Sequence, residues 1–355
     1  MAEAVFWISV IFIAYVYFGY PLLLAAWKFA APKRVNKRYW EPPVSIVIAM
    51  RNERTNAERK IRNCLKLNYP AEKVQVIVSL DGPTDGVEAE VQPYASKGVE
   101  IVFSPVHRGK AAALNAAMEV ATGEIVVFTD ARQQLHPDAV RELAANFADP
   151  EVGAVSGELV LLEESGRQAS SAVGVYWRYE KWLRALESAT HSVIGATGAI
   201  YAIRRELFTP LPAGTILDDV LIPMRIVLGG KRVVFDSSAR AYDLAAANPE
   251  AEYARKTRTL TGNYQLLAQM PALLVPWRNP VFLQFLSHKP GRLLVPYFLI
   301  ALFVSNLPLE QGIYRAAFLL QLFWYGLAAI GAVAARRRLT GTPAEVGYGR
   351  SQRQI

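Results

Sequence analysis

Three long stretches near the ends of the chain contain no charged residue. They contain 24, 17 and 20 residues and occupy positions 4–27, 293–309 and 316–335. A helix that crosses the hydrocarbon core of a bilayer needs about 20 apolar residues, with roughly 17 to 25 tolerated. The pattern therefore predicts an N-terminal transmembrane helix over residues 4–31 and two more transmembrane helices within residues 292–336.

Between residues 44 and 244 the pattern is that of a soluble α/β domain. Short β-branched runs occupy residues 44–49, 74–80, 99–103 and 124–129, and segments with helical spacing occupy residues 53–67, 110–121 and 137–147. Strands that alternate with helices predict a mostly parallel, Rossmann-like sheet with right-handed crossovers. Ligands of such sheets bind beyond the carboxyl ends of the strands, so polar residues there are the first candidates for chemistry.

The segment 259–291 is apolar but interrupted. Its first 19 residues carry no charge, yet Pro271 and Pro276 suit a bilayer interior poorly. We predict amphipathic helices that lie in the membrane interface, with Trp277 at the level of the headgroups. For residues 262–270, a buried helix of a soluble domain is an equally good interpretation. Residues 337–355 are predicted to form a cytoplasmic tail.

The net charge is +8, and the basic residues cluster beside the apolar stretches. Residues 33–62 carry +6, residues 255–292 carry +6 and residues 336–355 carry +4, so the rest of the chain carries −8. Basic residues that flank membrane spans mark the cytoplasmic side. We therefore predict a multi-pass protein of the inner (cytoplasmic) membrane whose α/β domain is cytoplasmic. A nucleic-acid-binding surface is disfavoured, because no basic run is interleaved with aromatic residues on a recognisable binding module.

Cysteine and histidine usage argues against two classes of site. Cys64 is the single cysteine, which excludes an intramolecular disulfide and a multi-cysteine zinc site. The four histidines are far apart in the sequence and show no HExxH spacing. A metal site built from histidines is therefore disfavoured.

Acidic residues follow three of the predicted strands. Glu53 lies in the Arg51-Asn52-Glu53 sequence after the first strand, Asp81 ends the second, and Asp130 follows the fourth. Taken singly, an Asp-Gly pair such as that at Asp81 is more typical of a turn. Because the ends of parallel strands meet at one edge of a sheet, the three acids together predict a site for a nucleotide base, a ribose or a divalent cation.

Two further candidates precede predicted helices. Lys110 follows Gly109 at a helix start, where a lysine and the positive end of the helix dipole suit phosphate oxygens. No Walker pattern accompanies it. Asp218 and Asp219 precede apolar residues with helical spacing, so a helix N-cap is one interpretation of this pair and a catalytic carboxylate is the other.

These motifs, in this order, resemble the family 2 glycosyltransferases with the GT-A fold, and more closely their membrane-embedded, synthase-like branch. The resemblance covers roughly residues 40–295, with a catalytic GT-A domain over residues 40–258. The sequences that carry it are RNE (51–53), DGPTDG (81–86), RGKAAALNAAM (108–118), TDAR (129–132), GATGAIYAIRRELF (195–208), LDD (217–219) and RKTRTLTGNYQLL (255–267).

The resemblance implies a role for each matching residue. Asp219 would be the general base. The nucleotide-binding residues would be Arg51, Glu53, Asp81, Lys110 and Asp130. Asp130 would also hold a divalent cation, Mg²⁺ or Mn²⁺. The residues near the diphosphate or the acceptor would be Arg132, Gly198, Asp218, Arg255 and Arg258.

Two positions depart from the family pattern. Arg132 stands where the second aspartate of a DxD motif often lies, which leaves a hard cation with one protein carboxylate fewer and weakens the prediction of metal dependence. The family's QxxRW motif reads Arg255-Lys256-Thr257-Arg258-Thr259. The loss of its tryptophan, which commonly holds the acceptor sugar, argues against processive polymer synthesis.

The resemblance implies a membrane-bound, inverting glycosyltransferase. It would move a sugar from a nucleotide-diphosphate sugar, with a UDP-sugar the first expectation, to a lipid or polysaccharide acceptor at the membrane. It would have no nucleic-acid partner, but an oligomeric state or an export partner is compatible with the short membrane part. The alternatives are transfer onto a polyprenyl phosphate, or an inactive scaffold that senses nucleotide.

Overall fold

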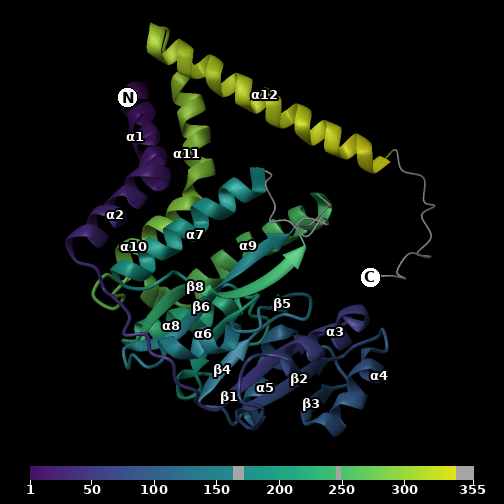
Figure 1. Cartoon of the computed structure of the whole chain (residues 1–355). Coiled ribbons are helices and arrows are strands. Elements are labelled where there is room, and N and C mark those ends of the chain that lie inside the picture. The colour runs from purple at the N-terminus through teal and green to yellow at the C-terminus, as the bar shows by residue number, and fades with distance from the viewer. Residues whose placement is uncertain (163–171, 245–248, 341–355) are drawn as a thin grey trace. The chain divides into compact units, whose positions relative to one another are not determined.

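A computed structural model describes residues 1–162, 172–244 and 249–340 (Figure 1). The chain divides into two compact units. The larger contains Tyr15–Leu293, and the other contains Met1–Ala14 together with the residues from Leu294 onward. Most of the predicted tail, from residue 341 on, lies outside the described residues.

Eight strands in the described part of the larger unit form one sheet, in the order β3-β2-β1-β4-β7-β6-β8-β5. Their bounds are β1 (Val44–Met50), β2 (Val74–Asp81), β3 (Val99–Ser104), β4 (Ile125–Phe128), β5 (Gln134–Leu135), β6 (Val152–Leu162), β7 (Tyr201–Arg204) and β8 (Arg232–Leu244). β1, β2, β3 and β4 are the four runs expected from the sequence, each within about one residue of its predicted bounds.

The sheet is mostly parallel, as expected, but it is mixed. β1 pairs in parallel with β2 and β4, β2 with β3, and β6 with β8. β7 lies antiparallel between β4 and β6, and β5 lies antiparallel to β8. A strand that follows a loop instead of a crossover helix can run antiparallel, and β7 directly follows the loop 191–200.

The helices of the larger unit are α2 (Tyr20–Ala30), α3 (Arg54–Leu65), α4 (Val87–Val91), α5 (Lys110–Val120), α6 (Ala139–Asn146), α7 (Ala172–Thr190), α8 (Asp218–Leu228), α9 (Pro249–Gln269) and α10 (Phe282–His288). Two cores cover the two faces of the sheet. In β1, Ile46 and Ile48 belong to one core and Val47 to the other, as the two-residue period of a strand requires. The first core includes residues of α3, α4 and α6, and the second includes residues of α5, α8 and α10.

The segment from α9 to α10 is amphipathic. Met270, Leu273 and Phe285 are buried in the second core, whereas Trp277 and Leu283 are exposed. Its inward face thus belongs to the larger unit. Its outward apolar residues are compatible with the predicted position in the membrane interface, which stays a prediction.

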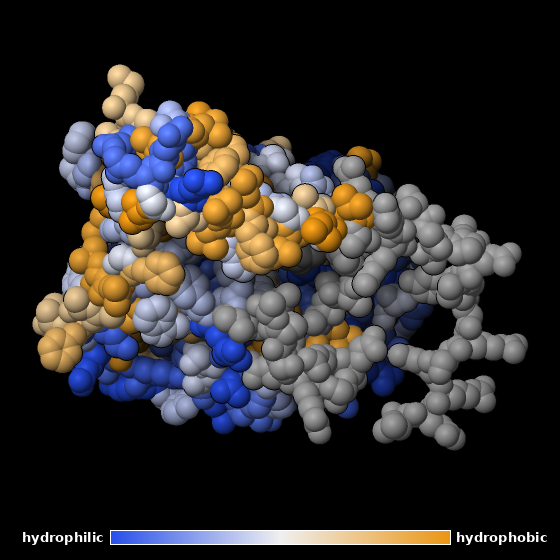
Figure 2. Space-filling model, turned by 90° about the horizontal axis from the view of Figure 1, so that it is seen from above, coloured by the Kyte–Doolittle hydropathy of each residue, from blue (hydrophilic) through white to orange (hydrophobic). Residues whose placement is uncertain are grey.

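The other unit consists of α1 (Ala2–Ala14), most of α11 (Pro290–Asn306) and α12 (Gly312–Thr340). Trp7 Nε1 donates a hydrogen bond to Tyr314 Oη at 3.2 Å, and the Phe12 and Phe298 rings stack at 4.0 Å. Much of its remaining apolar surface is exposed, and Figure 2 colours such hydrophobic residues orange. An exposed apolar surface of this kind indicates that the unit contacts an apolar partner rather than water.

Two helices in the described residues are long and apolar enough to cross a membrane. They are Ala2–Ala30, in which α1 and α2 are joined by a π-helical turn (Tyr15–Gly19), and Gly312–Gly331. The helix Pro290–Asn306 is apolar but shorter. The two longer helices coincide with the first and last of the three predicted spans, and the number of spans stays a prediction.

Candidate active site

The loops after β1 and β2 are tied together. Asn52 has a φ of 54°, a left-handed conformation that asparagine tolerates better than most residues. Its Oδ1 accepts a hydrogen bond from the backbone N–H of Thr84 at 2.8 Å. The neighbouring Glu53 is half-buried and accepts a bond from Asn56 Nδ2 at 2.7 Å, whereas Arg51 is exposed. The structure thus places Arg51 and Glu53 beside the β2 loop, at the carboxyl edge of the sheet.

Asp81, at the end of β2, holds the loop that leads into α5. Its carboxylate accepts hydrogen bonds from His107 Nδ1 at 2.6 Å and from the backbone N–H groups of Arg108 and Gly109 at 2.7 and 2.8 Å. Burial alone would raise the pKa of Asp81, but these bonds lower it below its usual value. Gly82 is required here, because an added Cβ would lie 2.2 Å from the His107 nitrogen. The carboxylate of Asp81 therefore holds this loop in place. Its contact with a nucleoside stays a prediction.

Lys110 joins two of the predicted site acids. Its Nζ lies 3.0 Å from Asp130 Oδ1, after β4, and 3.2 Å from Asp218 Oδ2, at the start of α8. Burial would lower the pKa of Lys110, but the carboxylates of Asp130, Asp218 and Asp219 raise it well above its usual value. Residues 110, 130 and 218, far apart in the sequence, thus meet in one place.

The aspartate pair begins α8 without capping it. Leu217 occupies the N-cap position, and Asp218 and Asp219 are the first two helical residues. The N-cap interpretation of the pair was therefore wrong. Carboxylates in the first turn of a helix are favoured by its positive end. Asp218 is buried, and the hydroxyl of Tyr201 lies 3.5 Å from its Oδ2.

Asp219 is held by the loop that precedes β7. Its Oδ2 accepts a hydrogen bond from the backbone N–H of Gly198 at 3.1 Å, and its backbone carbonyl accepts one from Ala196 at 2.6 Å. Burial and the adjacent charge of Asp218 raise the pKa of Asp219 to about 6, although Lys110 and Lys289 act in the opposite direction. A half-buried carboxylate with this pKa can accept a proton near neutral pH.

Asp130 is the only carboxylate in the TDAR motif. Arg132 is exposed and lies 3.8 Å from Asp243 Oδ2. Within the described residues, no group of three or more histidine, cysteine, aspartate or glutamate side chains could hold a metal ion. A single carboxylate fits a hard cation that takes its other ligands from phosphate oxygens and water. The donor set thus fits Mg²⁺ or Mn²⁺ that arrives with a diphosphate, rather than an ion bound by protein alone.

Arg255 and Arg258 lie on α9, where both are exposed. No described hydrogen bond or ion pair joins Arg258 to Asp130 or Asp219. Their assignment to the diphosphate or the acceptor stays a prediction.

Two lysines near the site escaped the sequence analysis. Lys60 is fully buried in α3, and its Nζ donates hydrogen bonds to Thr129 Oγ1 and to the Gln133 carbonyl, on either side of Asp130. It shares the buried face of its helix with Ala57 and Ile61. A lysine on an apolar helix face was the signal that could have found it. Lys289 follows α10, and its charge acts on Asp219.

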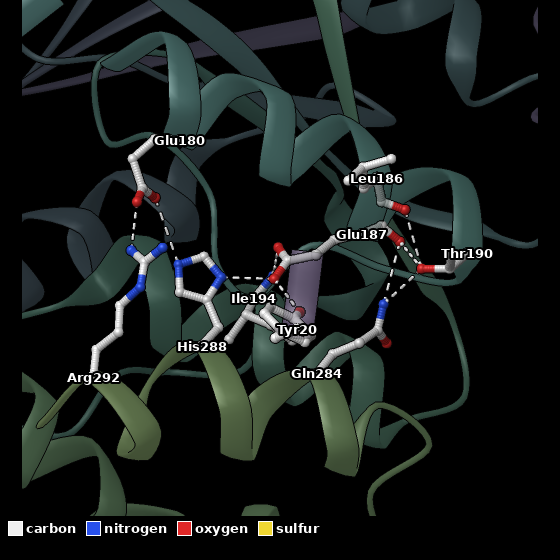
Figure 3. Close-up of polar contacts among 9 residues, drawn as sticks. All are labelled: Tyr20, Glu180, Leu186, Glu187, Thr190, Ile194, Gln284, His288 and Arg292. Carbon is white, nitrogen blue, oxygen red and sulfur yellow. Dashed lines mark hydrogen bonds and ion pairs between the residues drawn. The ribbon is translucent and has the colours of Figure 1, made fainter. Parts of the chain in front are cut away.

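A buried polar cluster attaches α10 to α7 (Figure 3). Glu187 is fully buried, and its Oε1 accepts hydrogen bonds from the Tyr20 hydroxyl at 2.7 Å and from His288 Nδ1 at 2.6 Å. His288 Nε2 lies 3.5 Å from Glu180, which also pairs with Arg292. Burial alone would raise the pKa of Glu180, but His288 and Arg292 hold it far below its usual range. The cluster fixes α10, which Lys289 directly follows.

Comparison with known proteins gives matches over this same part of the chain. A protein-family model described as "Glycosyl transferase family 2" matches residues 45–210. The chain is 33% identical over 131 residues to an "N-acetylglucosaminyltransferase" of Rhizobium leguminosarum bv. trifolii, a match that covers 35% of this chain and 70% of the relative.

A longer relative and a solved structure extend the similarity. The chain is 23% identical over 230 residues to a "Poly-beta-1,6-N-acetyl-D-glucosamine synthase" of Staphylococcus aureus (strain COL), covering 63% of this chain. The match spans 55% of that synthase. A mannosyltransferase from Pyrobaculum calidifontis, solved with GDP-Man and Mn²⁺, superposes with a TM-score of 0.71 and 24% identity, covering 96% of this chain and 95% of the other. That likeness shows the fold.

Proposed function

The chain belongs to glycosyl transferase family 2 and is a glycosyltransferase related to polysaccharide synthases, and from that premise we propose that it transfers a sugar from a nucleotide-diphosphate sugar to an acceptor at the membrane. A UDP-sugar is the first donor to test, and a GDP-sugar is the second, because the structural neighbour was solved with GDP-Man. One observation carries the proposal. Lys110 joins Asp130 and Asp218 at one point, and Asp219 follows directly in the chain.

The donor phosphates would lie at Lys110 and Asp130. The leaving nucleoside diphosphate gains negative charge as the glycosidic bond breaks, and an ammonium group fixed before the reaction stabilises that charge. Mg²⁺ or Mn²⁺ held by Asp130 and the diphosphate would supply further positive charge. The structural neighbour with Mn²⁺ supports a divalent cation here. The Lys110 ammonium lies 3.0 Å from Asp130 and 3.2 Å from Asp218. It would turn toward the phosphate oxygens when a cation neutralises Asp130.

Asp219 would accept the proton of the acceptor hydroxyl. A hydroxyl is a weak nucleophile until a base takes its proton, and such a base contributes about 10² to 10⁴ in rate. The Gly198 amide fixes one carboxylate oxygen and leaves the other for the acceptor. One base and one direct displacement invert the anomeric carbon, so an α-linked donor would yield a β-glycoside.

The acceptor would be a lipid or a growing polysaccharide held at the bilayer. The basic segment 33–62, the exposed apolar residues of α9 and α10, and the two long apolar helices support this location. We propose the inner membrane, with the catalytic unit in the cytoplasm, where nucleotide sugars are made.

The test is the Asp219→Asn variant of the full-length protein in nanodiscs, assayed with a panel of UDP- and GDP-sugars and membrane lipids. We expect turnover to fall by about 10³-fold while donor binding stays within threefold of the unchanged protein. Asp138→Asn, at a half-buried carboxylate at the N-cap of α6, is the matched control. Near-normal turnover of Asp219→Asn on neutral acceptors would show that Asp219 is not the general base.

The same assay separates the two alternatives. A polyprenyl phosphate carries an already ionised nucleophile, so an Asp219→Asn variant that stays active on it alone would favour that acceptor. An unchanged protein that binds nucleotide but transfers no sugar to any acceptor would favour the scaffold.

A further inference from the structure

Lys60 is a buried cation that the reaction scheme above does not use. Its side chain is fully buried in α3, among the apolar residues of the first core. Burying an ammonium group is costly unless hydrogen bonds compensate it. In the described part of the chain, the hydrogen-bond partners of its Nζ are a hydroxyl and a carbonyl, not a carboxylate. Because a buried ammonium group destabilises a core, we expect Lys60 to have a role that an apolar side chain could not have.

Both partners of Lys60 belong to one short loop. Nζ lies 2.7 Å from Thr129 Oγ1 and 2.8 Å from the carbonyl oxygen of Gln133. Thr129 is the first residue after β4, and Gln133 is the last residue before β5. The ammonium therefore closes the loop 129–133 at its two ends, and Asp130 and Arg132 project from the closed loop.

The same contact reaches the loop that holds the general base. Thr129 Oγ1 accepts a hydrogen bond from Lys60 and donates one to the carbonyl oxygen of Ala199 at 2.8 Å. Ala199 follows Gly198, whose amide contacts Asp219. The hydroxyl of Thr129 is thus oriented from both sides, and the donor loop and the base loop are fixed relative to each other.

We propose that Lys60 is a positioning residue of the donor site, because it pins both ends of the loop 129–133 and so sets where Asp130 and Arg132 meet the donor diphosphate. This inference rests on the proposed function. Lys60 does not touch the donor. It acts through the backbone of the loop, and the loop is ordered before the donor arrives. A site held ready in this way binds its ligand with less loss of conformational entropy.

The main test is the Lys60→Met variant of the full-length protein, which keeps an apolar side chain of similar length and removes both hydrogen bonds. In the nucleotide-free protein we expect amide hydrogen exchange of residues 130–132 to accelerate at least tenfold. We expect UDP and GDP, each with Mn²⁺, to bind at least tenfold more weakly in calorimetry.

Ile61→Ala is the matched control. Ile61 is the neighbouring buried residue of the same helix, and its truncation leaves a cavity in the same core. It makes no hydrogen bond to the loop through its side chain. We expect loop exchange and diphosphate affinity within twofold of the unchanged protein, although the variant is less stable. Equal effects of Ile61→Ala and Lys60→Met would assign Lys60 to the core alone and overturn the inference.

Thr129→Val provides a second variant if Lys60→Met does not fold. Valine has the shape of threonine but neither accepts the Lys60 bond nor donates to Ala199. We expect faster loop exchange and weaker diphosphate binding, at least threefold each. Unchanged loop exchange in both variants would overturn the positioning role. Failure of the unchanged protein to bind UDP or GDP would contradict the proposed function instead, and loop exchange would still decide the role of Lys60.

Discussion

Gly198 and Asp219 are in direct contact, and the contact leaves little room for a side chain at position 198. The Gly198 amide donates a hydrogen bond to Asp219 Oδ2 at 3.1 Å, and a Cβ built on Gly198 would lie 3.1 Å from the same oxygen. That separation is shorter than an ordinary van der Waals contact. The glycine therefore sets the position of the carboxylate that we propose as the base.

The Gly198→Ala variant should turn over about tenfold more slowly, because the added methyl group displaces Asp219 by a few tenths of an ångström from the acceptor. The KM for the donor should stay within twofold, since the donor phosphates lie at Lys110 and Asp130. Steady-state kinetics with varied donor check both values. Gly229→Ala is the control, because its Cβ would meet its nearest neighbours at 3.4 and 3.5 Å. A rise in donor KM with unchanged kcat would place Gly198 at the donor instead.

The pH dependence of kcat/KM should report the ionisation of Asp219. The pKa of this carboxyl is raised to about 6, and the base works only when deprotonated, so activity should rise with pH and reach half its plateau near pH 6. Asp218 raises that pKa and Lys289 lowers it. Asp218→Asn should therefore move the acid limb to lower pH, and Lys289→Met should move it to higher pH. Shifts of opposite sign would contradict this electrostatic scheme.

Arg132→Asp should increase the affinity of the protein for the divalent cation. It restores a second carboxylate two residues after Asp130, and hard cations bind more tightly as carboxylate ligands are added. We expect the Mn²⁺ concentration for half-maximal nucleotide binding to fall about tenfold, which corresponds to about 1.4 kcal/mol. Arg132→Ala separates the new carboxylate from the loss of the arginine charge. Because the pair with Asp243 is long and partly exposed, stability should change by less than about 0.5 kcal/mol.

His288→Leu should destabilise the catalytic unit strongly. It leaves the buried carboxylate of Glu187 without its imidazole hydrogen-bond partner, and losing a hydrogen bond to a buried charged group costs about 1.5 to 3 kcal/mol. Chemical denaturation of the protein in detergent measures the loss. His136→Leu, at a half-buried imidazole 3.7 Å from Asp138, is the control and should cost less than about 1 kcal/mol. Similar losses in both variants would show that the cluster contributes little.

The first half of the sheet could be predicted from local pattern. β1 to β4 are short β-branched runs, and the helices between them have clear apolar spacing. β5 has two residues, and β7 pairs antiparallel with β4 and β6, which lie far away in the sequence. Neither property is encoded within a window of ten residues, so pattern alone could not supply them.

The acids of the site were found because each follows an apolar strand or precedes an apolar helix. That Lys110 pairs with both Asp130 and Asp218 could not be predicted, since it depends on how α5, β4 and α8 pack. The N-cap interpretation of Asp218-Asp219 was wrong by one position, because Leu217 is the N-cap residue of α8. Lys60 was missed for a related reason: sequence shows a lysine on an apolar face, but only packing shows what it contacts.

The burial of Met270 and Phe285 in the second core also affects how the enzyme can be shortened. A truncation at residue 258, the predicted end of the catalytic domain, would remove one wall of the catalytic unit and expose apolar residues of the second core. Cutting after Leu293 keeps that wall together with Leu283 and Leu286 on its outside. A soluble version of this enzyme is therefore better sought by replacing those outward leucines with polar residues than by deleting the helix that carries them.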